Sequence, residues 1–296
     1  MLVKHIAIVG LGLIGGSFAL AVRNAGVAER ITAWDTSDAL EKALASGLID
    51  APEEAFEKGH VCEAELIYLA VPVGAIIHFL LQRGGGVKPG AIVTDAGSTK
   101  REICRAARAG LASGVHFIGG HPMAGSHHRG FDYARDDLFR GAPYALVAGD
   151  EFDASGVAQA EALQRVQRLI EAIGGKPVII TAACHDRAVA RISQAPQLIA
   201  TALALAVGES GDAAEMALAG SGFADMTRLA ASHWSVWEDI LRTNGDEISG
   251  ALVEFSRVLE VARAATANAD SARLQEAFGA ANEFIRRVNE KKALNV

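Results

Sequence analysis

A glycine-rich loop near the start of the chain constrains its fold more than any other feature. The apolar run Ile6–Val9 leads directly into Gly10-Leu-Gly12-Leu-Ile-Gly15, and a helical pattern follows. Gly10 permits a tight turn, Gly12 lets the backbone approach a pyrophosphate, and Gly15 lets the helix pack closely against the strand. The pattern predicts a dinucleotide-binding domain, and the alternative is a glycine-rich turn without a ligand. The loop residues expected to bind the cofactor are Gly10, Gly12, Leu13, Ile14 and Gly15.

An acidic residue after the second apolar run indicates which dinucleotide is bound. The run Arg30–Trp34 ends in Asp35, twenty residues after Gly15, which is the spacing expected for a carboxylate that hydrogen-bonds the adenosine ribose. A negative charge there opposes a 2′-phosphate, and Thr36 stands where an NADP site often carries arginine. We therefore expect NAD as the cofactor.

The distribution of helix breakers divides the chain into two parts. Residues 1–182 contain 24 of the 31 glycines and six of the seven prolines. In this part short apolar runs alternate with helical patterns, which is typical of a mainly parallel sheet covered on both faces. The expected strands are His5–Val9, Arg30–Trp34, Leu66–Ala70, Ala91–Asp95, Val115–Ile118, Tyr144–Val147 and Pro177–Ile180. The expected helices include Leu13–Ala25, Asp38–Ala45, Arg101–Ala112 and Ala158–Ile173.

Residues 183–296 show only the helical period of 3.6, in the runs 185–207, 213–219, 224–242 and 246–265. We therefore expect an α/β, Rossmann-type doubly wound domain over 1–182, followed by an all-helical domain over 183–296. The run 192–207 is apolar almost all round, and a helix of this kind is buried. A second copy of so small a domain can cover it, which predicts a homodimer through the helical domain. The alternative is an ordinary core helix packed against its own first domain.

Composition excludes several classes of protein. Half of the 296 residues are hydrophobic, and the formal net charge is −7, which argues against a disordered chain and against nucleic acid as a partner. Cys62, Cys104 and Cys184 are far apart, so they predict neither a disulfide framework nor a metal site. Glycines interrupt the apolar stretch Ile6–Ala21, which argues against a targeting or membrane segment. We expect a cytoplasmic protein without a metal.

Two later segments follow predicted strands and are expected to line the same crevice. Leu69–Pro72 and Thr94–Lys100 each begin at the carboxyl end of a strand, where open α/β sheets bind ligands. The first segment places Val71 and Pro72 near the cofactor, and the second places Ser98 there. The alternative is a pair of plain strand-to-helix turns, with Ser98 or Thr99 as a helix cap.

One histidine of the nine lies where it can meet the cofactor. His121 stands at the end of a predicted strand, between glycines and before Pro122. An imidazole with a pKa near neutrality suits the acceptance of a proton from a hydroxyl while hydride leaves. We expect His121 to be the catalytic base, and the alternative is a surface or capping role.

At these residues the sequence resembles the prephenate and arogenate dehydrogenases of tyrosine biosynthesis. The resemblance covers nearly the whole chain. It rests on the segments Gly10–Ser17, Val71–Val73, Asp95–Lys100, Gly119–Gly125, His185-Asp186, Ser221–Ala230, Trp237–Ile240 and Asn244. The last four segments are the most specific, because dinucleotide-binding proteins in general do not share them.

The resemblance implies a role for each matching residue. It implies that His121 accepts the proton of the ring hydroxyl of prephenate while hydride passes to NAD, and that Ser98 supports both groups. It implies that Arg228 holds the ring carboxylate, which leaves as carbon dioxide; a guanidinium matches a carboxylate in bidentate fashion. An intrahelical pair with Asp225 is the alternative for Arg228, and a core position is the alternative for Trp237. The remaining substrate-binding residues implied are Gln197, Ser221 and Trp237.

Two departures from the family leave the choice between prephenate and arogenate open. Relatives commonly carry Ser-His-Leu-Pro-His where this chain has Ser193-Gln-Ala-Pro-Gln197. Gln194 and Gln197 keep hydrogen-bonding capacity but carry no charge. The loop 126–130 reads Ser-His-His-Arg-Gly, where many relatives place a glutamate.

Two other functions remain as alternatives. The 3-hydroxyacid dehydrogenases combine a Rossmann domain with a helical domain, but they rely on a lysine in the first long helix after the boundary. The stretch His185–Leu205 contains no lysine. A non-catalytic NAD-binding sensor would keep Gly10, Gly12 and Asp35 without needing His121 and Arg228 in their motifs.

Overall fold

The computed structural model describes residues 1–125, 128, 130–147 and 157–294. Contacts divide the chain into two compact units, Met1–Gly245 and Asp246–Val296. The boundary expected at 182/183 falls at the start of helix α7 (Ala182–Val189) and stays a prediction.

The first unit is built on one eight-stranded sheet with the order β3-β2-β1-β4-β5-β6-β7-β8. Neighbouring strands are parallel except for β6 and β7, so the expected mainly parallel, Rossmann-type sheet is confirmed. The strands are β1 Val3–Val9, β2 Ala28–Trp34, β3 Ala51–Pro52, β4 Leu66–Leu69, β5 Ile92–Asp95, β6 His116–Pro122, β7 Pro143–Val147 and β8 Lys176–Ile180.

Strand β6 is longer than the sequence pattern suggests. Its expected end was Ile118, but residues Gly119–Pro122 continue the strand because they pair antiparallel with β7, from Gly119 opposite Val147 to Pro122 opposite Tyr144. His121 therefore lies within a strand rather than in a loop, and strand pairing fixes its backbone.

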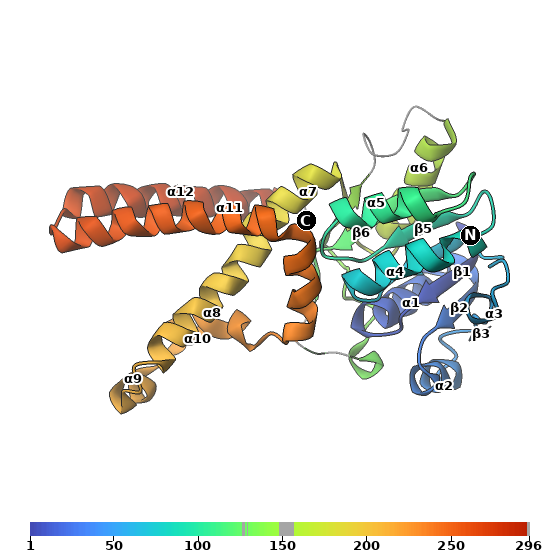
Figure 1. Ribbon diagram of the computed structural model, residues 1–296, viewed down its shortest axis with the longest axis horizontal. Coiled ribbons are helices and arrows are strands. Elements are labelled where there is room, and N and C mark those ends of the chain that lie inside the picture. The colour runs from blue at the N-terminus through green and yellow to red at the C-terminus, as the bar shows by residue number, and fades with distance from the viewer. Residues whose placement is uncertain (126–127, 129, 148–156, 295–296) are drawn as a thin grey trace. The chain divides into compact units, whose positions relative to one another are not determined.

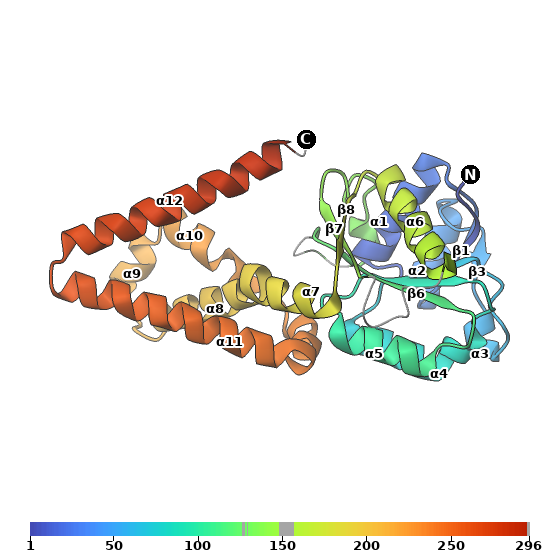
Figure 2. The same cartoon turned by 90° about the horizontal axis from the view of Figure 1, so that it is seen from above.

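Helices cover both faces of the sheet (Figures 1 and 2). Helices α1 (Leu13–Ala25), α2 (Ser37–Ala45) and α6 (Val157–Ala172) pack on one face. Helices α3 (Ala55–Lys58), α4 (Val73–Arg83) and α5 (Arg101–Gly110) pack on the other, and the short 3-10 helices Gly84–Gly86 and Phe131–Tyr133 lie in loops.

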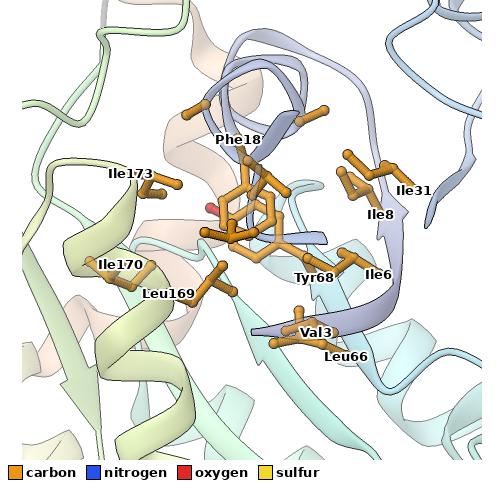
Figure 3. Packing of buried hydrophobic residues seen from close by; sticks show 14 of the residues in the cluster. Val3, Ile6, Ile8, Phe18, Ile31, Leu66, Tyr68, Leu169, Ile170 and Ile173 are labelled. Atoms are coloured by element: carbon orange, nitrogen blue, oxygen red, sulfur yellow. The ribbon is translucent and has the colours of Figure 1, made fainter. Parts of the chain in front are cut away.

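Each face of the sheet has its own apolar core, because alternate residues of a strand point to opposite faces. Ile6 and Ile8 of β1 belong to one core and Ala7 to the other, and all three are fully buried. Figure 3 shows the first core, in which the ring of Phe18 stacks on that of Tyr68 with centroids 3.8 Å apart. This packing fixes the carboxyl ends of the central strands.

The helical part of the first unit follows β8. The expected helix over 185–207 is three consecutive segments, α7, a π-helical turn over Ala190–Gln194 and α8 (Ala195–Gly208). Helices α9 (Ala213–Leu218) and α10 (Ser221–Thr227), the 3-10 helix η4 (Arg228–Ala231) and the start of α11 (Trp234–Ala267) complete it. The expected helix over 224–242 is thus interrupted by η4, and α11 has a non-helical residue at Asn244.

The apolar run 192–207 is poorly covered by its own chain. Among the residues of α8 only Ala195, Gln197 and Ala200 are buried, whereas Ile192 and Leu205 are 68% and 58% exposed. The alternative of an ordinary core helix packed on its own first domain is therefore wrong.

The second unit consists of the rest of α11 and helix α12 (Ser271–Leu294), joined by residues 268–270. Both helices expose large apolar side chains: Val253, Phe255, Val258, Leu259, Val261, Phe278, Phe284 and Ile285. Within the described residues, no helix combines the length and the apolar character needed to cross a membrane.

Candidate active site

A cavity of about 360 Å³ opens in the first unit at the carboxyl ends of β1, β4 and β5. It brings together most of the residues that the sequence assigns to the cofactor, together with Ser98. The predicted site residues that line it are Gly12, Leu13, Ile14, Val71, Pro72 and Ser98. Val236 and Ile240 of α11 line another part of the wall.

The glycine loop has the geometry that its spacing predicts. Gly10 has φ +94°, a conformation that favours glycine. A Cβ atom on Gly15 would lie 1.8 Å from the Gly10 carbonyl oxygen, so only glycine allows this close approach of helix to loop. Gly12 has no atom within 4 Å of its ideal Cβ position and stands at the N-terminus of α1 without a side-chain cap. An open backbone at a helix N-terminus fits the pyrophosphate of a dinucleotide.

Asp35 lies at the end of β2 and ties the glycine loop to that strand. Its carboxylate accepts hydrogen bonds from the Leu11 and Thr36 backbone N–H groups. It does not line the cavity. The assignment of the ribose to Asp35 stays a prediction.

His121 is the first member of a chain of hydrogen bonds. Its Nδ1 lies 2.8 Å from His185 Nε2, and His185 Nδ1 lies 2.8 Å from Asp186 Oδ1. The Asp186 carboxylate also accepts the backbone N–H groups of Lys100 and Arg101 at 2.7 and 2.9 Å. Asp186 therefore caps the N-terminus of α5 and orients His185 at the same time.

This chain fixes the tautomers of both histidines. An ionised Asp186 only accepts, so His185 donates from Nδ1 and, when neutral, accepts at Nε2. His121 then donates from Nδ1 and keeps an unprotonated Nε2. The histidine pair thus presents one basic nitrogen, which is what a general base requires.

Burial keeps both histidines neutral. It lowers the pKa of His121 well below 6.5, and the neighbouring His185 and Lys100 lower it further. Burial also lowers the pKa of His185, against the opposing effect of Asp186. For Asp186, burial acts to raise the pKa, but hydrogen bonds from His185 and the Arg101 backbone outweigh it and lower the pKa below 3.8.

A buried ion pair supports the backbone directly before Ser98 and His121. Lys100 and Asp95 are fully buried and form an ion pair. Asp95 also accepts the backbone N–H groups of Gly97 and Gly120 at 2.8 and 3.0 Å. One carboxylate therefore holds the residues that directly precede Ser98 and His121.

Neither capping alternative for Ser98 and Thr99 is present. Helix α5 has no side-chain cap from the preceding turn, and Thr99 pairs instead with Thr243 at 2.8 Å. Ser98 itself lines the cavity, where a ligand can reach it.

The residues assigned to the substrate lie outside this cavity. Arg228 begins η4 and is exposed, and it makes no ion pair with Asp225 or any other described residue. Ser221 begins α10 and is exposed, and Trp237 is half-buried on α11. Their roles stay predictions. Of the loop 126–130, residues Ser126, His127 and Arg129 lie outside the described residues.

Both glutamines that replace the family histidines are buried and hydrogen-bonded. Gln194 Nε2 donates to the Ser98 carbonyl at 3.3 Å, and its Oε1 accepts from Asn244 Nδ2 at 2.7 Å. Gln197 Nε2 donates to the Leu229 carbonyl at 2.6 Å, and its Oε1 accepts from the Ser232 hydroxyl at 3.0 Å. Sequence reasoning missed these contacts and gave no role to His185 or Asp186, although an adjacent His-Asp pair in an apolar helix was a usable signal.

Two family models together span most of the chain. Residues 18–179 match "Prephenate dehydrogenase, nucleotide-binding domain", and residues 181–280 match "Prephenate dehydrogenase, dimerization domain". The chain is 33% identical to prephenate dehydrogenase of Bacillus subtilis over 285 residues, covering 94% of this chain and 74% of the relative. It is 32% identical to cyclohexadienyl dehydrogenase of Zymomonas mobilis over 279 residues, covering 93% and 92%.

Solved structures of prephenate and arogenate dehydrogenases also match this chain over nearly its whole length. Prephenate dehydrogenase from A. aeolicus, in complex with hydroxyphenyl propionate and NAD+, matches with a TM-score of 0.81 and 26% identity over 98% of this chain and 97% of that chain. Synechocystis arogenate dehydrogenase matches with a TM-score of 0.77 and 29% identity over 99% and 100%. A 3-hydroxyisobutyrate dehydrogenase from Salmonella typhimurium shares the fold alone, with a TM-score of 0.53 and 17% identity.

Proposed function

The chain belongs to the prephenate dehydrogenase family, and on this premise we propose that it catalyses the NAD-dependent oxidative decarboxylation of prephenate in tyrosine biosynthesis. The observation that carries the proposal is the hydrogen-bonded chain from His121 through His185 to Asp186. It belongs to the same unit as a cavity lined by the dinucleotide loop and by Ser98. The removal of a hydroxyl proton and a hydride requires a base, which a neutral His121 provides, and an oxidising cofactor, which the glycine loop would bind.

The residues of this chain supply acid–base chemistry and orientation. The unprotonated Nε2 of His121 accepts the proton of the ring hydroxyl, and Ser98 supports that hydroxyl. The glycine loop would hold NAD, which would supply the acceptor for the hydride of the carbinol carbon. The bond to the ring carboxylate breaks and carbon dioxide leaves, while its electron pair moves through the ring to the carbonyl oxygen left by the loss of the proton and the hydride. The protonated His121 returns its proton to that oxygen, which gives the aromatic phenol.

His185 and Asp186 have two tasks in this step. They hold His121 in the tautomer whose Nε2 is free, since only that form leaves Nδ1 to donate to His185. After His121 takes up the proton, its charge is stabilised through His185 by the Asp186 carboxylate. We assign Arg228 to the ring carboxylate, which its guanidinium can hold in bidentate fashion, and Ser221 and Trp237 to the wall of the substrate pocket.

One assay tests the reaction. Purified protein is mixed with prephenate or arogenate and with NAD or NADP, and nicotinamide reduction and carbon dioxide release are followed together. We expect nicotinamide reduction and carbon dioxide release with prephenate and NAD. The same measurement with arogenate shows whether it is also a substrate. A wild-type protein that reduces no nicotinamide with either substrate would overturn the proposal.

We also propose that the working form is a homodimer through the helical region, in the cytoplasm. Ile192 and Leu205 are mostly exposed, and so are the apolar side chains of the second unit. Such surface is typical of an interface. The three free cysteines agree with a reducing compartment. Light scattering at micromolar concentration should give twice the mass of the chain, and Leu205→Glu should shift it toward the monomer.

A further inference from the structure

Gln197 uses both ends of its amide inside the protein. The side chain is 5% exposed on α8. Its Nε2 donates to the Leu229 carbonyl at 2.6 Å, with a second, longer contact of 3.5 Å to Thr201 Oγ1. Its Oε1 accepts the Ser232 hydroxyl at 3.0 Å. Both donor hydrogens and one acceptor position are therefore occupied by protein groups.

The partners of this amide lie on one short element. Leu229 is the second residue of the 3-10 helix η4, and Ser232 directly follows its last residue. The first residue of η4 is Arg228, to which the proposed function assigns the ring carboxylate. The Gln197 amide therefore fastens to α8 the segment that carries the Arg228 guanidinium.

We propose that Gln197 is a positioning residue that sets the place of Arg228 through η4 and does not contact the substrate. This proposal rests on the proposed function, because it assumes that Arg228 holds the ring carboxylate. It replaces the role of a substrate-binding residue, which the resemblance implies for Gln197. The physical reason is that an amide whose NH2 group and oxygen are both already hydrogen-bonded has little capacity left to bind a ligand.

The two roles predict different kinetics. The ring carboxylate is common to prephenate and arogenate, so misplacing Arg228 weakens both substrates by the same factor. Gln197→Met keeps a similar side-chain volume but removes the hydrogen bonds to Leu229 and Ser232. We expect KM to rise about 10-fold for each substrate. We expect kcat and the affinity for NAD to stay within about twofold, since His121 and the glycine loop do not depend on η4.

The decisive experiment is a double-mutant cycle with Arg228→Gln. If Gln197 acts through Arg228, then adding Gln197→Met to Arg228→Gln changes KM by less than about twofold. Ser232→Ala removes one contact of the same amide from an exposed position, and we expect it to raise KM for both substrates about threefold, again only when Arg228 is present. This variant carries the test if Gln197→Met does not fold. Thr201→Val, which leaves the contacts to η4 in place, is the control and should change KM by less than twofold.

Two results would overturn the proposal. A change of more than about twofold in the ratio of kcat/KM for prephenate and arogenate means that Gln197 reads the substrate side chain. Losses that multiply in the double variant mean that it acts independently of Arg228. Failure of the proposed function looks different, because the wild-type protein is then inactive on both substrates, or Arg228→Gln alone leaves KM unchanged.

Discussion

The sheet region of the first unit and the helical region that follows β8 differ in how deeply their apolar side chains are buried. In the sheet region Ile6 and Ile8 are fully buried, whereas in the helical region Ile192 and Leu205 are mostly exposed. The predicted site residues follow the same division: Gly12 and Val71, expected for the cofactor, line a cavity, whereas Arg228, expected for the substrate, is exposed. The comparison teaches that the residues expected for the cofactor already line a cavity within one chain, whereas those expected for the substrate do not line it.

The largest effect should come from His121, which belongs to the sheet region by its backbone. We expect His121→Asn to lower kcat by about 10²–10⁴, the usual contribution of a positioned acid–base group. The affinity for NAD should change by less than twofold, because the glycine loop is untouched. Steady-state kinetics and a cofactor titration measure the two quantities, and His60→Asn, at an exposed position, is the control. A His121→Asn protein with wild-type kcat would remove this residue from the mechanism.

The difference between the regions also explains what could be predicted from the sequence. The glycine loop was predictable in detail, because Gly10 and Gly15 meet within one strand–loop–helix unit and their spacing encodes the contact. The partner of His121 was not, since His185 comes from another element 64 residues away. Spacing carries no signal for such a pair. The extension of β6 was missed for a related reason, because it depends on pairing with β7.

In the helical region the positions of the helices were easier to predict from the sequence than the contacts of their side chains. The expected runs 185–207, 213–219 and 224–242 fall on helices, but the break at η4 and the non-helical Asn244 were not expected, and no helical run was expected where α12 lies. Asn244 bonds Gln194 Oε1 and the Asp186 carbonyl, and these long-range contacts outweigh its helical surroundings. The buried roles of both glutamines depend on the same kind of contact.

The next largest effect should come from Arg228 and tests the helical side of the comparison. If Arg228 holds the ring carboxylate, Arg228→Gln removes a charge-assisted hydrogen bond, for which a loss of roughly 1.5–3 kcal/mol is typical. We expect this mostly in KM, for prephenate and arogenate alike, with NAD affinity unchanged. Arg228→Lys keeps the charge without the bidentate geometry, so its KM should lie between those of the wild-type protein and Arg228→Gln. Unequal losses for the two substrates would contradict the assignment of Arg228 to the shared carboxylate.

A smaller effect tests the sheet side by itself. Asp35→Ser combined with Thr36→Arg removes the carboxylate that opposes a 2′-phosphate and adds a cation that favours it. We expect the preference to move from NAD toward NADP by about 10-fold in kcat/KM, while the KM for prephenate stays within twofold. Parallel assays with both cofactors measure the change. A wild-type protein that already uses NADP as well as NAD would contradict the role of Asp35.

The smallest effect arises where the two regions share a hydrogen bond, between His121 of β6 and His185 of α7. Burial lowers the pKa of both histidines in the folded protein below the 6.5 expected in the unfolded chain. Below pH 6.5 the unfolded chain therefore binds more protons than the folded one, and the free energy of unfolding decreases as the pH falls. Above pH 6.5 this contribution is fully present. The lowered pKa of His5 acts in the same direction.

Urea unfolding at pH 7.5, 6.5 and 5.5, at one protein concentration, measures this slope. Each such histidine contributes at most about 1.4 kcal/mol per pH unit between its folded pKa and 6.5. We expect the unfolding midpoint to fall between pH 6.5 and 5.5, and His121→Asn to make that fall shallower by the share of one proton. Asp186 does not disturb the window, since its pKa is lowered below 3.8 and its contribution is lost only in stronger acid. An unchanged slope in His121→Asn would mean that its imidazole titrates in the folded protein as it does in the unfolded chain.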